Sequence, residues 1–110
     1  MPKTTLTDGS PVTDDHREID PATGLQKGYV VLSEEERSKG FVRPYRDAYR
    51  HAKCNAITTM SRPLAETYAC QPTFDSGTYC STCRTHFPVG PEGEFTWYEM
   101  DGSDGPKVGT

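Results

Sequence analysis

Two short pairs of residues carry side chains that bind transition metals readily. His51 and Cys54 lie in the stretch YRHAKC, and Cys80 and Cys83 lie in the stretch CSTC. The members of each pair are separated by two residues, a spacing that lets one tight turn direct both side chains at the same ion. Because zinc prefers four tetrahedral nitrogen and sulfur ligands, the sequence predicts one zinc site built from His51, Cys54, Cys80 and Cys83.

The fourth ligand has two other candidates. The remaining cysteine of the chain, Cys70, would complete an all-cysteine site, but it lies sixteen positions after Cys54 with a predicted helix between them. A cysteine at the end of a helix is often only a small buried apolar side chain. His86 follows Cys83 by three residues and would also serve as a nitrogen ligand. The paired spacing favours His51 and leaves both alternatives open.

The residues around the two pairs predict a structural metal and no enzyme. A catalytic zinc keeps one coordination position open for water and has a general base nearby, whereas four protein ligands close the coordination sphere. The His-Glu-x-x-His signature of zinc proteases is absent from the sequence. A redox role for CSTC is disfavoured, because Pro88 and Gly90 follow too soon for the helix that a thioredoxin-type motif begins.

The composition gives a physical reason for a structural metal. The chain has 110 residues, of which 33% are hydrophobic, and its mean hydropathy is −0.75. A single domain of this size and composition has a small apolar core, and such folds often depend on a metal, disulfides or a partner. The free energy of zinc binding, on the order of 10 kcal/mol or more in small zinc modules, would add to the free energy of folding.

The sequence also indicates where in the cell the protein is made. It contains no apolar run of about 18 residues or more, so no membrane-spanning helix is expected. The first residues, MPKTTLTDGS, lack the apolar segment of a secretory signal peptide. We therefore expect synthesis inside the cell, where cysteines stay reduced and disulfides are rare.

Local patterns predict the elements that position the first pair. A short strand is expected over residues 29–32, and Ser33 stands three residues before Glu36, the spacing of a capping box that begins a helix of one or two turns. Tyr49 and His51 alternate as on a strand that leads into the first ligand turn.

A second helix is predicted between the pairs, from about residue 62 to residue 70. Ser61 stands at its start as a cap, and Leu64 and Tyr68 are four residues apart, so they would share its buried face.

The chain divides into an arm and a folded domain. Residues 1–27 contain few apolar residues and many Pro, Gly, Asp and Thr, which predicts an extended arm. Ten of the eleven aromatic residues lie in residues 41–98, among them Phe95 and Trp97 on one face of a predicted strand. The predicted fold is a small α+β, zinc-ribbon-like module over residues 28–110, with short β-hairpins and one or two short helices.

Positive charge is concentrated around the first ligand pair. The net charge of the chain is −4, yet residues 37–62 hold seven basic residues and a single acid, Asp47, a local balance of +6. Either acids of the same chain such as Glu34, Glu35 and Glu36 balance these side chains, or they form a docking face for an acidic partner or for phosphates. The candidate partner-binding residues are Arg43, Arg46, Arg50 and Lys53.

Five segments of the chain resemble a family of small, uncharacterised bacteriophage and prophage proteins. These segments are GFVRPYRDAYRHAKCNAITTM, LAETYACQPTF, TYCSTCRTHFPVG, EFTWYEMDG and the final VGT. The resemblance covers roughly residues 33–110, includes all four predicted ligands and implies a zinc-ribbon-like module of phage origin. It departs at Cys70, where the family typically has a charged residue, which implies that Cys70 is not a ligand. The family has no assigned activity.

These features predict a non-enzymatic structural protein of a phage virion, such as a capsid cement or decoration protein or a tail accessory subunit. The protein would be made in the host cytoplasm and would dock on capsid or tail subunits through its arm and its basic face. The alternative is a phage-encoded zinc-ribbon regulator that binds nucleic acid or the transcription machinery, since arginines interleaved with Tyr45 and Tyr49 can stack on bases. The negative net charge favours the virion protein.

Overall fold

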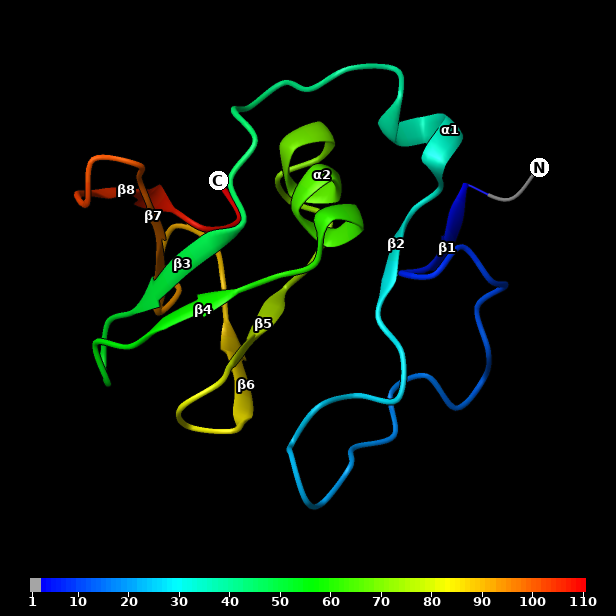
Figure 1. Cartoon of the computed structure of the whole chain (residues 1–110), viewed down its shortest axis with the longest axis horizontal. Coiled ribbons are helices and arrows are strands. Elements are labelled where there is room, and N and C mark those ends of the chain that lie inside the picture. The colour runs from blue at the N-terminus through cyan, green and yellow to red at the C-terminus, as the bar shows by residue number, and fades with distance from the viewer. Residues whose placement is uncertain (1–2) are drawn as a thin grey trace.

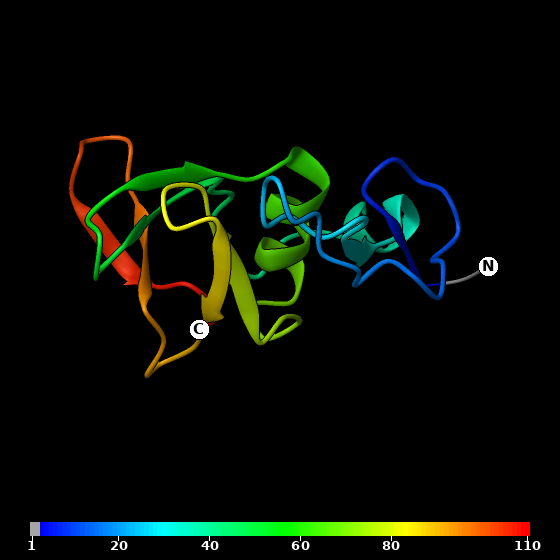
Figure 2. The same cartoon turned by 90° about the horizontal axis from the view of Figure 1, so that it is seen from below.

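The computed structural model describes residues 3–110 as an α+β protein with eight short strands and two helices (Figures 1 and 2). The strands are β1 (Thr4–Leu6), β2 (Val30–Leu32), β3 (Ala48–His51), β4 (Ile57–Thr59), β5 (Gly77–Cys80), β6 (Thr85–Pro88), β7 (Phe95–Tyr98) and β8 (Asp104–Lys107), and the helices are α1 (Glu34–Arg37) and α2 (Arg62–Cys70). They form three antiparallel sheets, with the orders β1-β2, β4-β3-β7-β8 and β5-β6. Within residues 3–110, no helix combines the length and the apolar character needed to cross a membrane.

Both helices lie where the local sequence predicts them. The hydroxyl of Ser33 accepts a hydrogen bond from the N–H of Glu36, which is the predicted cap of α1. In α2, the predicted face is buried, with Leu64 9% and Tyr68 3% exposed. Ser61 precedes α2 in an extended conformation but makes no capping hydrogen bond through its side chain. Burial of one apolar face is therefore the main stabilisation of α2.

The hydrophobic core joins α2 to the four-stranded sheet. Trp97 of β7 meets Tyr68 of α2 edge to face, with ring centroids 5.6 Å apart, and Phe95 meets Tyr49 of β3 in the same way at 5.1 Å. Edge-to-face aromatic pairs contribute about 0.5–1.5 kcal/mol beyond the burial of their surface. Phe95 and Trp97 are both buried, which confirms the predicted alternation along this strand.

The N-terminal segment, residues 3–27, folds back on the chain and does not form the extended arm that the sequence predicts. Thr4 of β1 pairs with Leu32 of β2, and the hydroxyl of Tyr79 donates a hydrogen bond to the carbonyl of Thr23. Figures 1 and 2 show this segment on one side of α2 and the four-stranded sheet on the other. Composition predicted an arm because the segment buries little apolar surface by itself, whereas these contacts come from backbone groups and distant side chains. The first two residues of the predicted arm lie outside the described residues.

Gly24 packs closely against the backbone of Arg84. Its φ is +79°, and a Cβ atom there would lie 1.7 Å from the carbonyl oxygen of Arg84. We expect Gly24→Ala to release the second half of the segment, because both the backbone conformation and the available space exclude a side chain. Limited proteolysis would detect the release as several-fold faster cleavage within residues 13–27.

Gly9→Ala is the matched control for this experiment. Gly9 has a similar φ of +86°, but a Cβ atom there would meet no atom within 4 Å. Both variants therefore carry the conformational strain, and only Gly24→Ala adds the collision with Arg84. Equal cleavage rates in the two variants would contradict the proposed contact.

Candidate metal centre

The two predicted ligand pairs lie at the tips of two β-hairpins. His51 ends β3 and Cys80 ends β5, and their partners Cys54 and Cys83 lie in the turns that lead to β4 and β6. The hairpins are joined at Thr58 and Ser81. The Ser81 N–H donates to Thr58 Oγ1 at 3.1 Å, and the two hydroxyl oxygens are also 3.1 Å apart. This connection brings the two turns side by side.

The ligand atoms of the two turns form one cluster. His51 Nδ1 lies 3.3 Å from Cys54 Sγ and 3.7 Å from Cys83 Sγ, and the sulfurs of Cys54 and Cys80 are 3.5 Å apart. All four atoms lie within 4.8 Å of one another. A tetrahedral zinc ion with Zn–S of about 2.3 Å and Zn–N of about 2.0 Å requires sulfurs about 3.8 Å apart and nitrogen–sulfur distances of about 3.5 Å. The donor types and the spacing therefore fit one tetrahedral zinc ion.

Both turns have the same backbone conformation. The N–H of Asn55 donates to the carbonyl of His51 at 2.7 Å, and the N–H of Arg84 donates to the carbonyl of Cys80 at 2.8 Å. Asn55 and Arg84 have φ angles of +64° and +57°, a region that glycine adopts most easily and asparagine tolerates better than most residues. Each turn thus reverses sharply just after its second ligand and leaves both ligands facing the same point.

The His51 ring is held in one orientation. Its Nε2 lies 2.8 Å from Glu94 Oε1, and the ring stands between Phe87 and Phe95, with centroid distances of 4.4 and 4.8 Å. An ionised carboxylate can only accept a hydrogen bond, so Nε2 donates to Glu94, and Nδ1 is the ring nitrogen that faces the sulfurs of the cluster. A carboxylate that orients a metal-binding histidine in this way is a common feature of zinc sites.

Glu94 is a candidate functional residue that no sequence pattern indicated. It precedes Phe95, whose pairing with His51 between β7 and β3 brings the two side chains together across 43 positions of sequence. The hydrogen bond from His51 is the main cause that lowers the pKa of Glu94, and Lys53, with Nζ 3.6 Å from Oε2, lowers it further. The carboxylate is therefore ionised at neutral pH. No local pattern separates this glutamate from the others in the chain.

We expect Glu94→Gln to weaken zinc binding by about 10- to 100-fold, the usual effect of removing a group that orients a ligating histidine. Glutamine keeps the shape of the side chain but replaces the charged acceptor with a neutral amide. Competition with a chromophoric zinc chelator would measure the affinity. Glu92→Gln is the matched control, because Glu92 is exposed and lies two positions away on the same turn. Equal zinc affinity in the two variants would contradict the role of Glu94.

The thiols of the cluster differ in acidity. Burial raises the pKa of Cys80, but the backbone N–H groups of Cys83 and Thr82 and the thiols of Cys54 and Cys83 outweigh burial and lower it to about 7. Desolvation and the thiols of Cys80 and Cys54 raise the pKa of Cys83 to about 11. The cluster therefore holds one thiolate easily and resists further negative charge, which a bound divalent cation would neutralise.

The two alternative ligands lie outside this cluster. The thiol of Cys70, at the end of α2, lies 3.5 Å from the carbonyl oxygen of Arg37. His86 Nε2 lies 2.8 Å from the hydroxyl oxygen of Tyr29. Within residues 3–110, the candidate ligand that lies with Cys54, Cys80 and Cys83 is His51.

Most of the predicted docking residues pair with acids of the same chain. The ion pairs are Arg46–Glu99 at 2.8 Å, Arg50–Asp104 at 3.0 Å and Lys53–Glu94 at 3.6 Å. Arg43 forms no ion pair among the described residues and donates to the carbonyl of its neighbour Val42 at 3.0 Å. Partly exposed ion pairs contribute little to stability, typically about 0–1 kcal/mol, but they neutralise the charge. The positive surface inferred from composition is thus reduced chiefly to Arg43.

Comparison with known proteins gives no relative from which a function can be transferred. The chain matches no protein-family model, no curated protein and no solved structure. The resemblance to phage proteins stays a prediction, and the function has to be argued from the site.

Proposed function

We propose that this protein is a non-enzymatic structural protein whose zinc-ribbon-like site holds one structural Zn²⁺ through His51, Cys54, Cys80 and Cys83. The observation that carries the proposal is the complete set of four nitrogen and sulfur ligand atoms within 4.8 Å of one another. A zinc ion there would have all four positions filled by protein atoms and none for water or substrate. Its role would be to hold the two hairpins together.

The packing around the cluster supports a structural role. Cys80 is fully buried and belongs to the same core cluster as Tyr49 and Phe95. The hydroxyl of Tyr49 donates a hydrogen bond to the carbonyl of Tyr79, the residue before Cys80. Loss of the metal would therefore disturb the aromatic core as well as the two turns.

Metal analysis of the purified protein tests this site directly. We expect one zinc per chain, with loss of near-ultraviolet circular dichroism when a strong chelator removes it. A zinc content near zero in protein purified without chelator, or a fully retained fold after chelation, would overturn the proposal.

We place this module in a bacteriophage virion, as a capsid cement or decoration protein or a tail accessory subunit that contacts other virion proteins. Besides the resemblance of its sequence, the exposed apolar side chains support a protein-binding role, namely Phe41, Val42, Tyr45 and Met100. A regulator that binds nucleic acid has less support. Arg46 and Arg50 pair with acids, and Tyr49, one of the two tyrosines that would stack on bases, is only 2% exposed.

Mass spectrometry of purified phage particles tests the virion assignment separately from the zinc site. We expect peptides of this protein in the particles at a constant ratio to the major capsid or tail protein. Expression in infected cells without incorporation into particles would overturn the virion assignment, and the metal analysis would be unaffected.

A further inference from the structure

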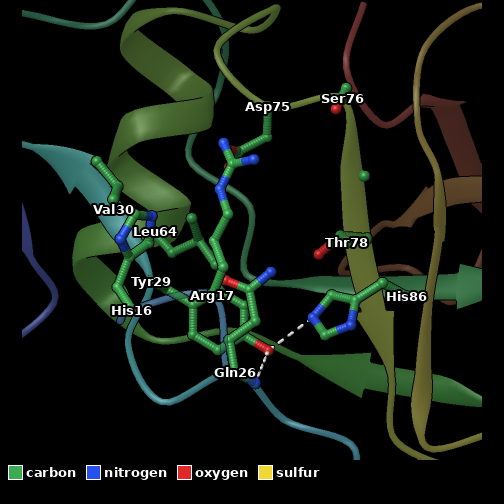
Figure 3. A pocket seen from close by; sticks show the side chains of 11 residues that line it. His16, Arg17, Gln26, Tyr29, Val30, Leu64, Asp75, Ser76, Thr78 and His86 are labelled. Atoms are coloured by element: carbon green, nitrogen blue, oxygen red, sulfur yellow. Dashed lines mark hydrogen bonds between the residues drawn. The ribbon is translucent and has the colours of Figure 1, made fainter. Parts of the chain in front are cut away.

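A pocket with a polar wall lies between the N-terminal segment and the rest of the chain (Figure 3). Its volume is about 290 Å³, near the lower end of the range of about 300–1,000 Å³ that is usual for small-molecule sites. The wall is formed by residues 16–30, by α2 and by the β5–β6 hairpin with the turn before it. None of the four candidate zinc ligands lines the pocket, so it is a separate site.

Asp75 supplies the carboxylate of this pocket. Among residues 3–110, neither a hydrogen bond nor an ion pair engages its side chain, and burial raises its pKa to about 6. A carboxylate that is partly removed from water without a compensating partner costs free energy. A cationic group of a ligand would supply the missing partner.

Arg17 brings the opposite charge to the same pocket. Its side chain lines the wall and points toward Asp75 in Figure 3, yet no ion pair joins the two residues. The side chains of Arg17, Gln26 and Ser76 make no hydrogen bonds among the described residues, although all three line the pocket. Within the described part of the chain, the pocket therefore presents one cation and one anion without partners, together with an amide and a hydroxyl.

Tyr29 and His86 are held in place by hydrogen bonds at the edge of the pocket. The N–H of Gln26 donates to the Tyr29 hydroxyl oxygen at 3.2 Å, and the same oxygen lies 2.8 Å from His86 Nε2. Figure 3 shows this chain of hydrogen bonds at the edge of the pocket. Val30 and Leu64 add an apolar part to the wall. A small ligand would thus meet polar groups that are already oriented and a limited apolar surface.

We propose that this pocket binds a small zwitterion, a free amino acid, with its ammonium group at Asp75 and its carboxylate at Arg17. The two charges are opposite, and among residues 3–110 neither has a partner in the same chain, so a ligand with a single charge would satisfy one residue and leave the other without a partner. A pocket of about 290 Å³ has room for one amino acid. The proposal is independent of the zinc site and uses none of its ligands.

Titration of the zinc-loaded full chain with single amino acids, followed by NMR of the His16 and His86 imidazoles, tests this proposal. Both histidines line the pocket, so a bound ligand would shift their signals. We expect saturable shifts with at least one amino acid and at least about tenfold weaker binding of ethylamine and of acetate, a difference of roughly 1.4 kcal/mol. The absence of saturable shifts with any amino acid at millimolar concentration, or equally tight binding of ethylamine, would overturn the proposal.

Substitutions test the two charged residues. Asp75→Asn and Arg17→Gln are each expected to weaken amino-acid binding at least about tenfold, while both variants stay folded. Asp47→Asn is the matched control, because Asp47 is exposed and lies outside this pocket. Unchanged binding in Asp75→Asn would overturn the proposal. A second result would also overturn it: the wild type binds no amino acid, and Asp75→Asn and Arg17→Gln both lower the stability of the fold. Asp75 and Arg17 would then be partners of each other.

Discussion

Cys80→Ser is expected to unfold the protein, whereas Cys70→Ser is expected to leave it folded. Cys80 is fully buried, and its sulfur lies 3.5 Å from that of Cys54 inside the candidate metal cluster. A serine hydroxyl is not ionised at neutral pH and is a poor zinc ligand, so the variant would lose most of the metal's contribution to folding. That contribution is on the order of 10 kcal/mol, comparable with the whole stability of a small domain, about 5–15 kcal/mol.

Cys70 is the control that the structure offers for this experiment. It lies outside the cluster, and its thiol is 3.5 Å from the carbonyl oxygen of Arg37, a contact that a serine hydroxyl can replace. The cost should be on the order of 1 kcal/mol, as for most single substitutions. Zinc content and near-ultraviolet circular dichroism of both variants would measure the difference. Equal damage from the two substitutions would favour an all-cysteine site and contradict the role of His51.

Asp75→Asn is expected to raise the free energy of unfolding by about 3 kcal/mol at pH 8 and by less at pH 5. Burial raises the pKa of Asp75 from its ordinary value of 3.8 to about 6 in the folded protein. A carboxyl with a higher pKa in the folded state binds its proton more tightly when folded. The stabilisation from the protonated Asp75 carboxyl is therefore present below the pKa that Asp75 has in the unfolded chain, near 4, and is lost as the pH rises through 6. Asparagine carries no charge and avoids this loss.

Denaturant unfolding of the wild type and the variant between pH 5 and pH 8 would measure this difference. Other titrating groups at the pocket, His16, His86 and Tyr29, are the same in both proteins, so they cancel when the two curves are compared. The stabilisation should grow from pH 5 to about pH 7 and then level off. Asp47→Asn should show no such trend. A difference that does not change with pH, or a destabilised Asp75→Asn, would contradict an unpaired and partly buried carboxylate.

These two experiments also separate a stabilising site from a functional one. Removing a zinc ligand should lower stability, whereas replacing Asp75 should raise it. A residue that lowers the stability of its own fold is typical of sites kept for binding. Loss of amino-acid binding in the more stable Asp75→Asn variant would therefore identify binding as the reason for an aspartate at this position.

The sequence by itself determined the features that depend on near neighbours. The two-residue spacing of the ligand pairs identified the candidate metal site, because a single turn decides whether both side chains reach one ion. The start of α1 at Ser33 and the buried face of α2 followed from hydrogen bonds and spacings within one helical turn. The alternation of Phe95 and Trp97 followed from the period of a strand.

Only the tertiary structure decided the features that depend on residues far apart in the chain. The choice of His51 over His86, and the orientation of His51 by Glu94, required the pairing of β3 with β7 and of β5 with β6. The return of the N-terminal segment and the pairing of Arg46 with Glu99 likewise join positions that no local pattern connects. A long-range contact depends on the path of the whole chain in space. Composition and periodicity describe only local stretches and do not specify that path.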